Sequence, residues 1–194
     1  MPIKYSDNKI FGIDSINPHI LFIKKGTVHP HSWIQNVNVK APDGMMAYGP
    51  KHKLNPNDCL VLAESLAIDT PGYKSPKCVL KEHSTDLVFG YTDKQNIKIA
   101  KANNAILNEN ANPNVGDAYA IVRNKIIDDE APYHIAYVIF KDGKTTITME
   151  ADSGQPKLKY PVFDMYDTVD KRKSFHSRYS KMYSPATTVV LKNR

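Results

Sequence analysis

Three side chains in this chain could together perform nucleophilic catalysis: the thiol of Cys59, the imidazole of His134 and the carboxylate of Glu150. A thiolate is a strong nucleophile, an imidazole moves protons near neutral pH, and a carboxylate can orient that imidazole. Together they predict attack on an amide carbonyl. A structural role stays open for each: Cys59 as a small hydrophobic side chain, and His134 as a strand residue bonded to a neighbour.

The segment from residue 133 to residue 152 is predicted to form a β-hairpin that brings His134 to Glu150. Two β-branched and aromatic runs flank an Asp-Gly pair, which is a strong hairpin signal. With a loop of residues 141–143 and Gly143 in a left-handed conformation, His134 lies directly opposite Glu150. Asp152 is only diagonal to His134 in this register, and it therefore ranks second as the orienting acid.

Within residues 54–68, a helix is predicted to start after Pro56, with Asn57 or Asp58 as its N-cap; it is apolar nearly all round and therefore buried. Cys59 lies in its first turn, where the helix dipole lowers the pKa of a thiol. Backbone N–H groups at this helix start, with the side-chain amide of Asn57 or Asn55, would hold the oxyanion. Cys78 follows a proline in an extended run, and we interpret it as structural.

The elements around these residues predict one α+β domain. Strands are expected at 115–122, beside the hairpin, at 161–167 and at 187–191. A weak amphipathic helix is expected at 93–108. We expect a single domain over 1–194, with a strand and loop part at 1–50 and a catalytic core at 54–194.

Three runs of this sequence carry a resemblance to a known family: NPNVGDAYAI, PYHIAYVIFKDGKTTITMEAD and FDMYDTVDKRKSFH. With the Asn-Asp-Cys helix start, they resemble papain-like toxin domains of bacterial polymorphic and contraction-injected toxin systems. The resemblance covers roughly residues 112–176. One departure is visible, because Ala151 and then Asp152 stand where an amide is expected after Glu150, and Asp152 therefore stays open as the orienting acid.

The resemblance implies a papain-like fold, with an antiparallel sheet packed against a buried helix that carries Cys59. It also implies a bacterial effector or toxin with His134 as the base and Glu150 as the orienting acid. Hydrolysis of a glutamine side chain gives a deamidase, which we favour over hydrolysis of a peptide bond, a protease. Transfer to an amine, as in a transglutaminase, uses the same atoms and stays an alternative.

The length, net charge and composition of the chain bear on its partners and its location. The chain has 194 residues and a net charge of +6, and its hydrophobic content of 41% argues against disorder. The N-terminal residues lack the apolar run of a signal peptide, so we expect synthesis in the cytoplasm, then secretion or injection into a target cell. A protein substrate there, and an immunity or chaperone protein, are the expected partners. No membrane span, cofactor or metal site is indicated.

A binding module is the competing class of function. Basic and aromatic residues alternate near the C-terminus, a pattern that fits single-stranded nucleic acid or a protein partner. The residues concerned are Lys171, Arg172, Lys173, Phe175, His176, Arg178 and Tyr179. The positive charge is otherwise spread along the chain, and nucleic acid is therefore the less favoured partner.

Overall fold

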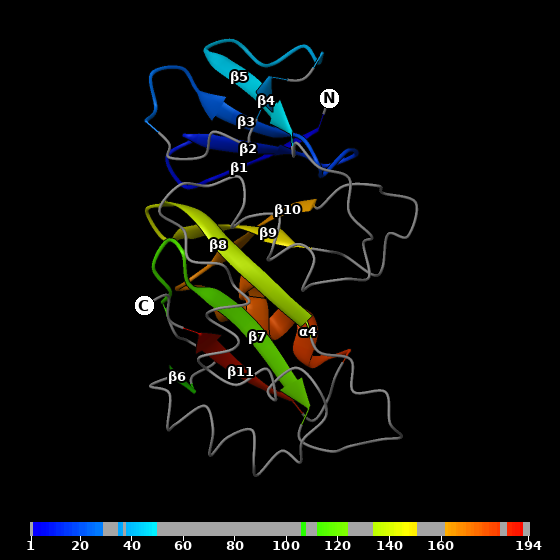
Figure 1. Ribbon diagram of the computed structural model, residues 1–194, viewed down its shortest axis with the longest axis vertical. Helices are drawn as coiled ribbons and strands as arrows, with labels where there is room; N and C mark the ends of the chain where they lie inside the picture. Colours follow the sequence, from blue (N-terminus) through cyan, green and yellow to red (C-terminus); the bar gives the residue numbers. More distant parts are fainter. Residues whose placement is uncertain are drawn as a thin grey trace.

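The structure is a computed structural model. It describes residues 2–28, 35–36, 38–49, 106–107, 112–123, 134–150, 162–182 and 186–191. These residues form two antiparallel β-sheets, one above the other in Figure 1, with a short helix against the second sheet.

The first sheet is built from the N-terminal residues. Its strands are β1 (Ile3–Tyr5), β2 (Phe11–Asp14), β3 (Leu21–Lys24), β4 (Gln35–Asn36) and β5 (Met45–Gly49), in the order β1-β2-β3-β5-β4. Its apolar residues gather in a small core of Ile20, Phe22, Met45 and Ala47. Strand β1 forms one edge of this sheet.

The second sheet holds the hairpin and the strands predicted beside it. Its strands are β6 (Ile106–Leu107), β7 (Ala118–Arg123), β8 (His134–Asp142), β9 (Thr145–Glu150), β10 (Val162–Asp167) and β11 (Ala186–Leu191). The order is β10-β9-β8-β7-β11-β6, so β10 forms an edge. The strands predicted at 115–122, 161–167 and 187–191 are thus confirmed within a few residues, and β7 does pair with β8. The helix predicted at 93–108 is wrong at its end, where β6 pairs with β11.

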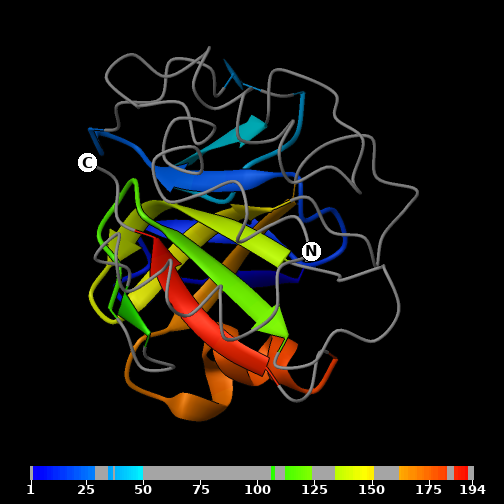
Figure 2. The same ribbon diagram turned by 60° about the horizontal axis from the view of Figure 1, so that its bottom comes forward.

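A 3-10 turn, η2 (Lys171–Lys173), leads into the six-residue helix α4 (Phe175–Ser180), which covers one face of the second sheet (Figure 2). Ser174 caps α4, because its side chain accepts a hydrogen bond from the Ser177 amide. Phe175 and Tyr179 are four residues apart and therefore share a helix face. Both are buried in a core that lies between α4 and the sheet. Its other members are Tyr119, Ile121, Ala136, Val138, Tyr166 and Val190.

The β8–β9 hairpin has a different register from the predicted one. Asp142 pairs with Thr145, which leaves Gly143 and Lys144 as the loop, and a bulge between Val138 and Phe140 shifts the pairing by one residue. Ala136, and not His134, is therefore opposite Glu150. Gly143 has the expected positive φ of 58°.

The carboxylate of Asp142 at this hairpin tip connects the two sheets. Its oxygens accept hydrogen bonds from Ser6 Oγ at 2.5 Å, from Asn8 Nδ2 at 2.7 Å and from the Asn8 amide at 2.8 Å. Burial alone would raise the pKa of Asp142, but these hydrogen bonds lower it. The aromatic rings of Phe11 and Phe140 stack beside it at 4.6 Å. The turn between β1 and β2 is thereby fixed to the hairpin tip.

The prediction of a papain-like α+β fold is wrong. The described residues are arranged as two antiparallel sheets with a single α-helix of six residues. The difference lies in the N-terminal part, whose short apolar runs pair into a separate five-stranded sheet. The helix predicted to carry Cys59 lies outside the described residues. The expectation of one domain over 1–194, with a strand and loop part at 1–50 and a core at 54–194, stays a prediction. None of the helices in the described segments has the length and apolarity needed to cross a membrane.

Candidate active site

The bulge in β8 decides which way His134 points. In the register at the hairpin tip, continued without a bulge, Tyr137 would lie opposite Glu150 and His134 would point to the opposite face. The bulge inserts one residue into β8 and returns the His134 side chain to the face of the sheet that carries Glu150. The actual pairing differs from the predicted one by two residues, and a shift of two leaves side chains on the same face. His134 therefore reaches Glu150 diagonally.

The contact between His134 and Glu150 is short and buried. Nε2 of His134 lies 2.5 Å from Oε1 of Glu150. Only 4% of His134 and 1% of Glu150 is exposed to solvent. Because the dielectric constant is low in such a place, the interaction is stronger than the same pair at a surface.

Three hydroxyl groups complete the surroundings of the Glu150 carboxylate. Oε1 accepts a second hydrogen bond from the Tyr179 hydroxyl, and Oε2 accepts from Thr148 Oγ1 and the Tyr166 hydroxyl, each at 2.6 Å. With His134, each carboxylate oxygen thus has two donors. An ionised carboxylate offers about four acceptor positions. Glu150 is therefore fully engaged, which suits an orienting group and excludes a role as nucleophile.

The charge of this cluster is consistent with its hydrogen bonds. Burial alone would raise the pKa of Glu150, but the hydrogen bond and charge of His134, with the charge of Arg178, lower it. Burial and the negative charge of Glu150 raise the pKa of Tyr166 and Tyr179. Both phenols therefore keep their protons at neutral pH and remain donors to the carboxylate.

Aromatic rings fix the plane of the imidazole. The ring of His134 stacks on Tyr179 with centroids 4.2 Å apart, and on Phe175 at 6.0 Å. Because Glu150 accepts from Nε2, the ring carries its proton on that nitrogen in the neutral state. Nδ1 is then the nitrogen that would exchange a proton with a nucleophile or substrate. Glu150 and the two aromatic rings together fix the orientation of the imidazole.

The sequence did not predict the hydroxyl donors or the aromatic rings of this site. Thr148 carried a usable signal, because it is two residues from Glu150 on the same strand and must share its face. Phe175 and Tyr179 showed a helical spacing of four residues, but they were assigned to the binding alternative. Tyr166 comes from β10, and no local pattern links it to Glu150.

The other predicted site residues lie outside the described residues: Cys59, Asn55, Asn57 and Asp152. Of the predicted set, the structure brings together His134 and Glu150. Within the described segments, no group of three histidine, cysteine or acidic side chains could hold a metal ion.

The residues of the binding alternative separate into two sets. Phe175 and Tyr179 are 1% and 4% exposed, so neither ring is accessible for stacking on a base. Arg172, Lys173 and Arg178 are accessible at the surface and line a cleft. The charges of that segment are thus available to a partner, and these two aromatic rings are not.

Comparisons of this sequence and structure with protein-family models, with curated proteins and with solved structures give no match.

Proposed function

We propose that this protein is a cysteine-dependent amide hydrolase that acts on a protein target, as a bacterial effector or toxin. One observation carries the proposal: an imidazole held at 2.5 Å by a buried carboxylate whose four acceptor positions are all filled. Such a carboxylate can orient His134 and stabilise its protonated form. Cys59 is the nucleophile that the sequence predicts for this base.

The reaction would proceed by proton transfer and acyl transfer. Nδ1 of His134 takes the thiol proton of Cys59, and the sulfur attacks the amide carbon. Backbone N–H groups, with the side-chain amide of Asn57 or Asn55, stabilise the oxyanion. His134 then returns the proton to the departing amine or ammonia. Water, deprotonated by His134, hydrolyses the thioester and releases a carboxylic acid and the free thiol.

The substrate decides the name of the activity. A glutamine side chain gives ammonia and makes the protein a deamidase, which we favour over a protease acting on the peptide bond. An acceptor amine in place of water gives a transglutaminase-like transfer. The described residues are shared by all three reactions, so the product must identify the activity.

The proposal is tested with the full chain, candidate target proteins and intact-mass spectrometry. Deamidation replaces an amide nitrogen by oxygen, proteolysis cuts the target, and transfer adds the amine. We expect Cys59→Ala to lower kcat by about 10³-fold or more, whereas the matched variant Cys78→Ser keeps its activity. Full activity of Cys59→Ala would overturn the proposal.

A second readout separates a positioning role of Glu150 from a structural one. The alkylation rate of Cys59 by iodoacetamide measures how much thiolate the base generates. In a folded Glu150→Gln variant, we expect slower alkylation of Cys59 and unchanged alkylation of Cys78. Equal rates at Cys59 in both proteins would mean that Glu150 does not act through His134. Replacing Asp152 by alanine should cost less activity than replacing Glu150.

A further inference from the structure

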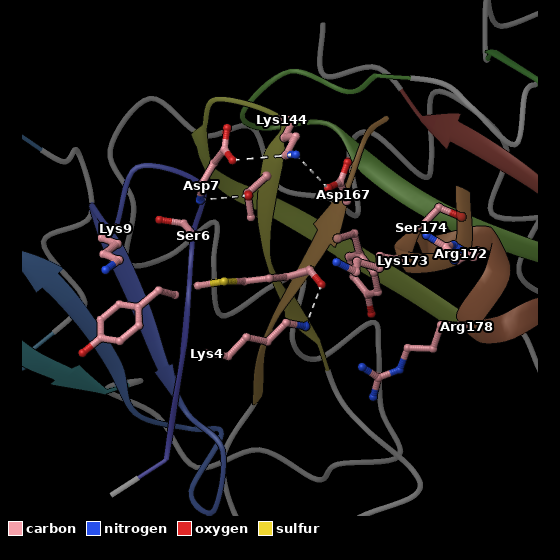
Figure 3. Close-up of a pocket in the computed structure, with 14 residues that line it drawn as sticks. Lys4, Ser6, Asp7, Lys9, Lys144, Asp167, Arg172, Lys173, Ser174 and Arg178 are labelled. Atoms are coloured by element: carbon pink, nitrogen blue, oxygen red, sulfur yellow. Dashed lines mark hydrogen bonds and ion pairs between the residues drawn. The ribbon is translucent and has the colours of Figure 1, made fainter. Parts of the chain in front are cut away.

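A basic cleft lies at the surface between the edges of the two sheets. Its volume is about 750 Å³, which is in the range of small-molecule sites. Strand β1 and the following turn form one wall, while η2 and α4 form the other (Figure 3). Strand β10 and the tip of the β8–β9 hairpin lie between them. Tyr166 lines this cleft, and its hydroxyl reaches Glu150.

Positive charge dominates the lining of the cleft. Among the described residues, six cationic side chains line it, against two carboxylates, Asp7 and Asp167. The cations are Lys4, Lys9, Lys144, Arg172, Lys173 and Arg178. They come from both walls and from the hairpin tip, and Figure 3 shows the Arg178 guanidinium directed from the α4 side towards the Lys4 side. A compact anion in the cleft would therefore meet cations from several directions.

Two further carboxylates, outside the lining, pair with these cations. Asp164 pairs with Lys4 at 3.4 Å and with Arg178. Asp170 pairs with Arg172 at 3.3 Å and with Lys173 at 4.0 Å. Among the described residues, the six cations still outnumber the two lining carboxylates and these two. Because each of these two carboxylates contacts two cations, it orients them and offsets only part of their charge.

The cations of the cleft also repel one another. Burial is the main cause that lowers the pKa of the Lys4 ammonium group; the charges of Arg178 and Lys173 lower it further, and the charge of Glu150 raises it. An anion bound between the walls would relieve this repulsion. This electrostatic gain is the driving force that the geometry offers to a ligand.

A tight turn presents Lys9 to the cleft. Its φ is +55°, the left-handed conformation, and it is the non-glycine residue with positive φ in the described segments. Glycine or asparagine would fit this turn at a lower conformational cost. The Lys9 ammonium lies 6.0 Å from the centroid of the Tyr5 ring and lines the cleft.

The edge of β10 argues against an extended peptide as the occupant. A peptide that added a strand here would need free backbone groups on β10. The Phe163 amide already donates to the Pro18 carbonyl at 2.7 Å. The Met165 amide donates to Asp164 at 2.8 Å, and the Met165 carbonyl accepts from Lys4 at 3.1 Å. Because these backbone groups already have partners, side chains that line the cleft would make the main contacts with a ligand.

We propose that this cleft is a binding site for a compact small molecule that carries several phosphate groups. Arginine binds phosphate oxygens in pairs, and lysine adds point charges around them. The cations surround one concavity from both walls, which suits a compact polyphosphate better than the long backbone of a nucleic acid. The binding site is separate from His134 and does not depend on the hydrolase activity.

The test is calorimetric titration of the full chain with inorganic tripolyphosphate at low ionic strength. We expect one bound ligand per chain and an affinity that falls as salt is added. The double variant Arg172→Gln/Lys173→Gln should bind at least about 10-fold more weakly, because it loses charge-assisted hydrogen bonds. The matched control, Lys171→Gln/Lys181→Gln, removes two exposed charges of the same region that do not line the cleft, and it should keep the affinity.

A further variant guards against misfolding as an explanation. Lys9→Gly removes a cation and also relieves the positive φ, so it should bind more weakly and resist urea at least as well as the natural chain. Absence of one-to-one binding, or equal weakening by the control pair, would overturn the proposal. So would tighter binding of a short single-stranded oligonucleotide that the same variants abolish, because the cleft would then be a nucleic-acid surface.

Discussion

Charged side chains gather in two regions of this molecule that meet at strand β10, and the two regions differ in their access to water. In the buried cluster, Glu150 has every acceptor position filled by His134 and three hydroxyls at 2.5–2.6 Å. In the basic cleft, Lys4, Lys144, Arg172 and Lys173 face carboxylates at 3.3–4.0 Å, Arg178 pairs closely with Asp164, and these cations reach solvent. The first arrangement fixes a geometry, and the second leaves positive charge for a ligand. The same residue types thus stabilise the fold in one place and would provide recognition in the other.

The largest effect on stability is expected at Glu150. Glu150→Ala leaves His134 and three buried hydroxyls without their acceptor, and breaking a buried pair costs about 3–5 kcal/mol. Urea denaturation measures the loss. The matched change in the cleft is Asp7→Ala, whose carboxylate faces Lys144 at 4.0 Å and should cost about 0.5 kcal/mol. Equal losses in the two variants would show that the buried and the exposed carboxylates do not differ in the way that we infer.

The next largest effect is expected from acid, which should destabilise the protein through its buried carboxylates. The pKa of Glu150 is lowered from its ordinary value of 4.5 to about 2 in the folded state. Between these two pKa values the unfolded chain binds more protons than the folded protein. The stability that Glu150 contributes is therefore fully present above pH 4.5 and is lost as the pH falls towards 2. Asp142 adds to the same loss, because its pKa is also lowered. Urea midpoints at about pH 7 and about pH 3.5 measure the effect.

Two variants identify the carboxylate responsible. Glu150→Gln should flatten the dependence on acid, because no proton is taken up at that position. Thr148→Val removes one donor to Glu150 and so moves its folded-state pKa back towards 4.5, which should make the acid-induced loss of stability smaller than in the natural chain. If neither variant changes the acid dependence, the lowered pKa of Glu150 does not contribute to it.

The strands of the second sheet could be predicted because their signals are local. β-branched and aromatic runs, with an Asp-Gly turn, mark β8 and β9 within a residue or two. The register could not be predicted in the same way. The bulge between Val138 and Phe140 lies in a continuous apolar run, VIF, where no glycine or polar residue marks it. The predicted contact of His134 with Glu150 is present because the error in register was two residues, which preserves the face.

The rest of the site depends on contacts between distant parts of the chain. Tyr166 and Tyr179 reach Glu150 from two elements that follow it by 16 and 29 residues. The cleft joins Lys4, Lys144 and Arg178, whose positions along the chain suggested only a diffuse surplus of charge. The fold class was wrong for a related reason. The order of Cys59, His134 and Glu150 fits the papain-like pattern, but residue order does not show that the N-terminal strands pair into a sheet of their own.

The smallest effect on stability is expected from the charges of the cleft. Arg172 and Lys173 are exposed, and their pairs with Asp170 are of the surface kind that contributes little to stability. In the absence of ligand, removing Lys173 also lessens the repulsion around Lys4, which offsets part of that loss. Arg172→Gln/Lys173→Gln should therefore change the free energy of unfolding by about 0.5 kcal/mol or less, as measured in urea. A loss as large as that of Glu150→Ala would mean that these cations hold the fold together, and the contrast between the buried cluster and the basic cleft would no longer stand.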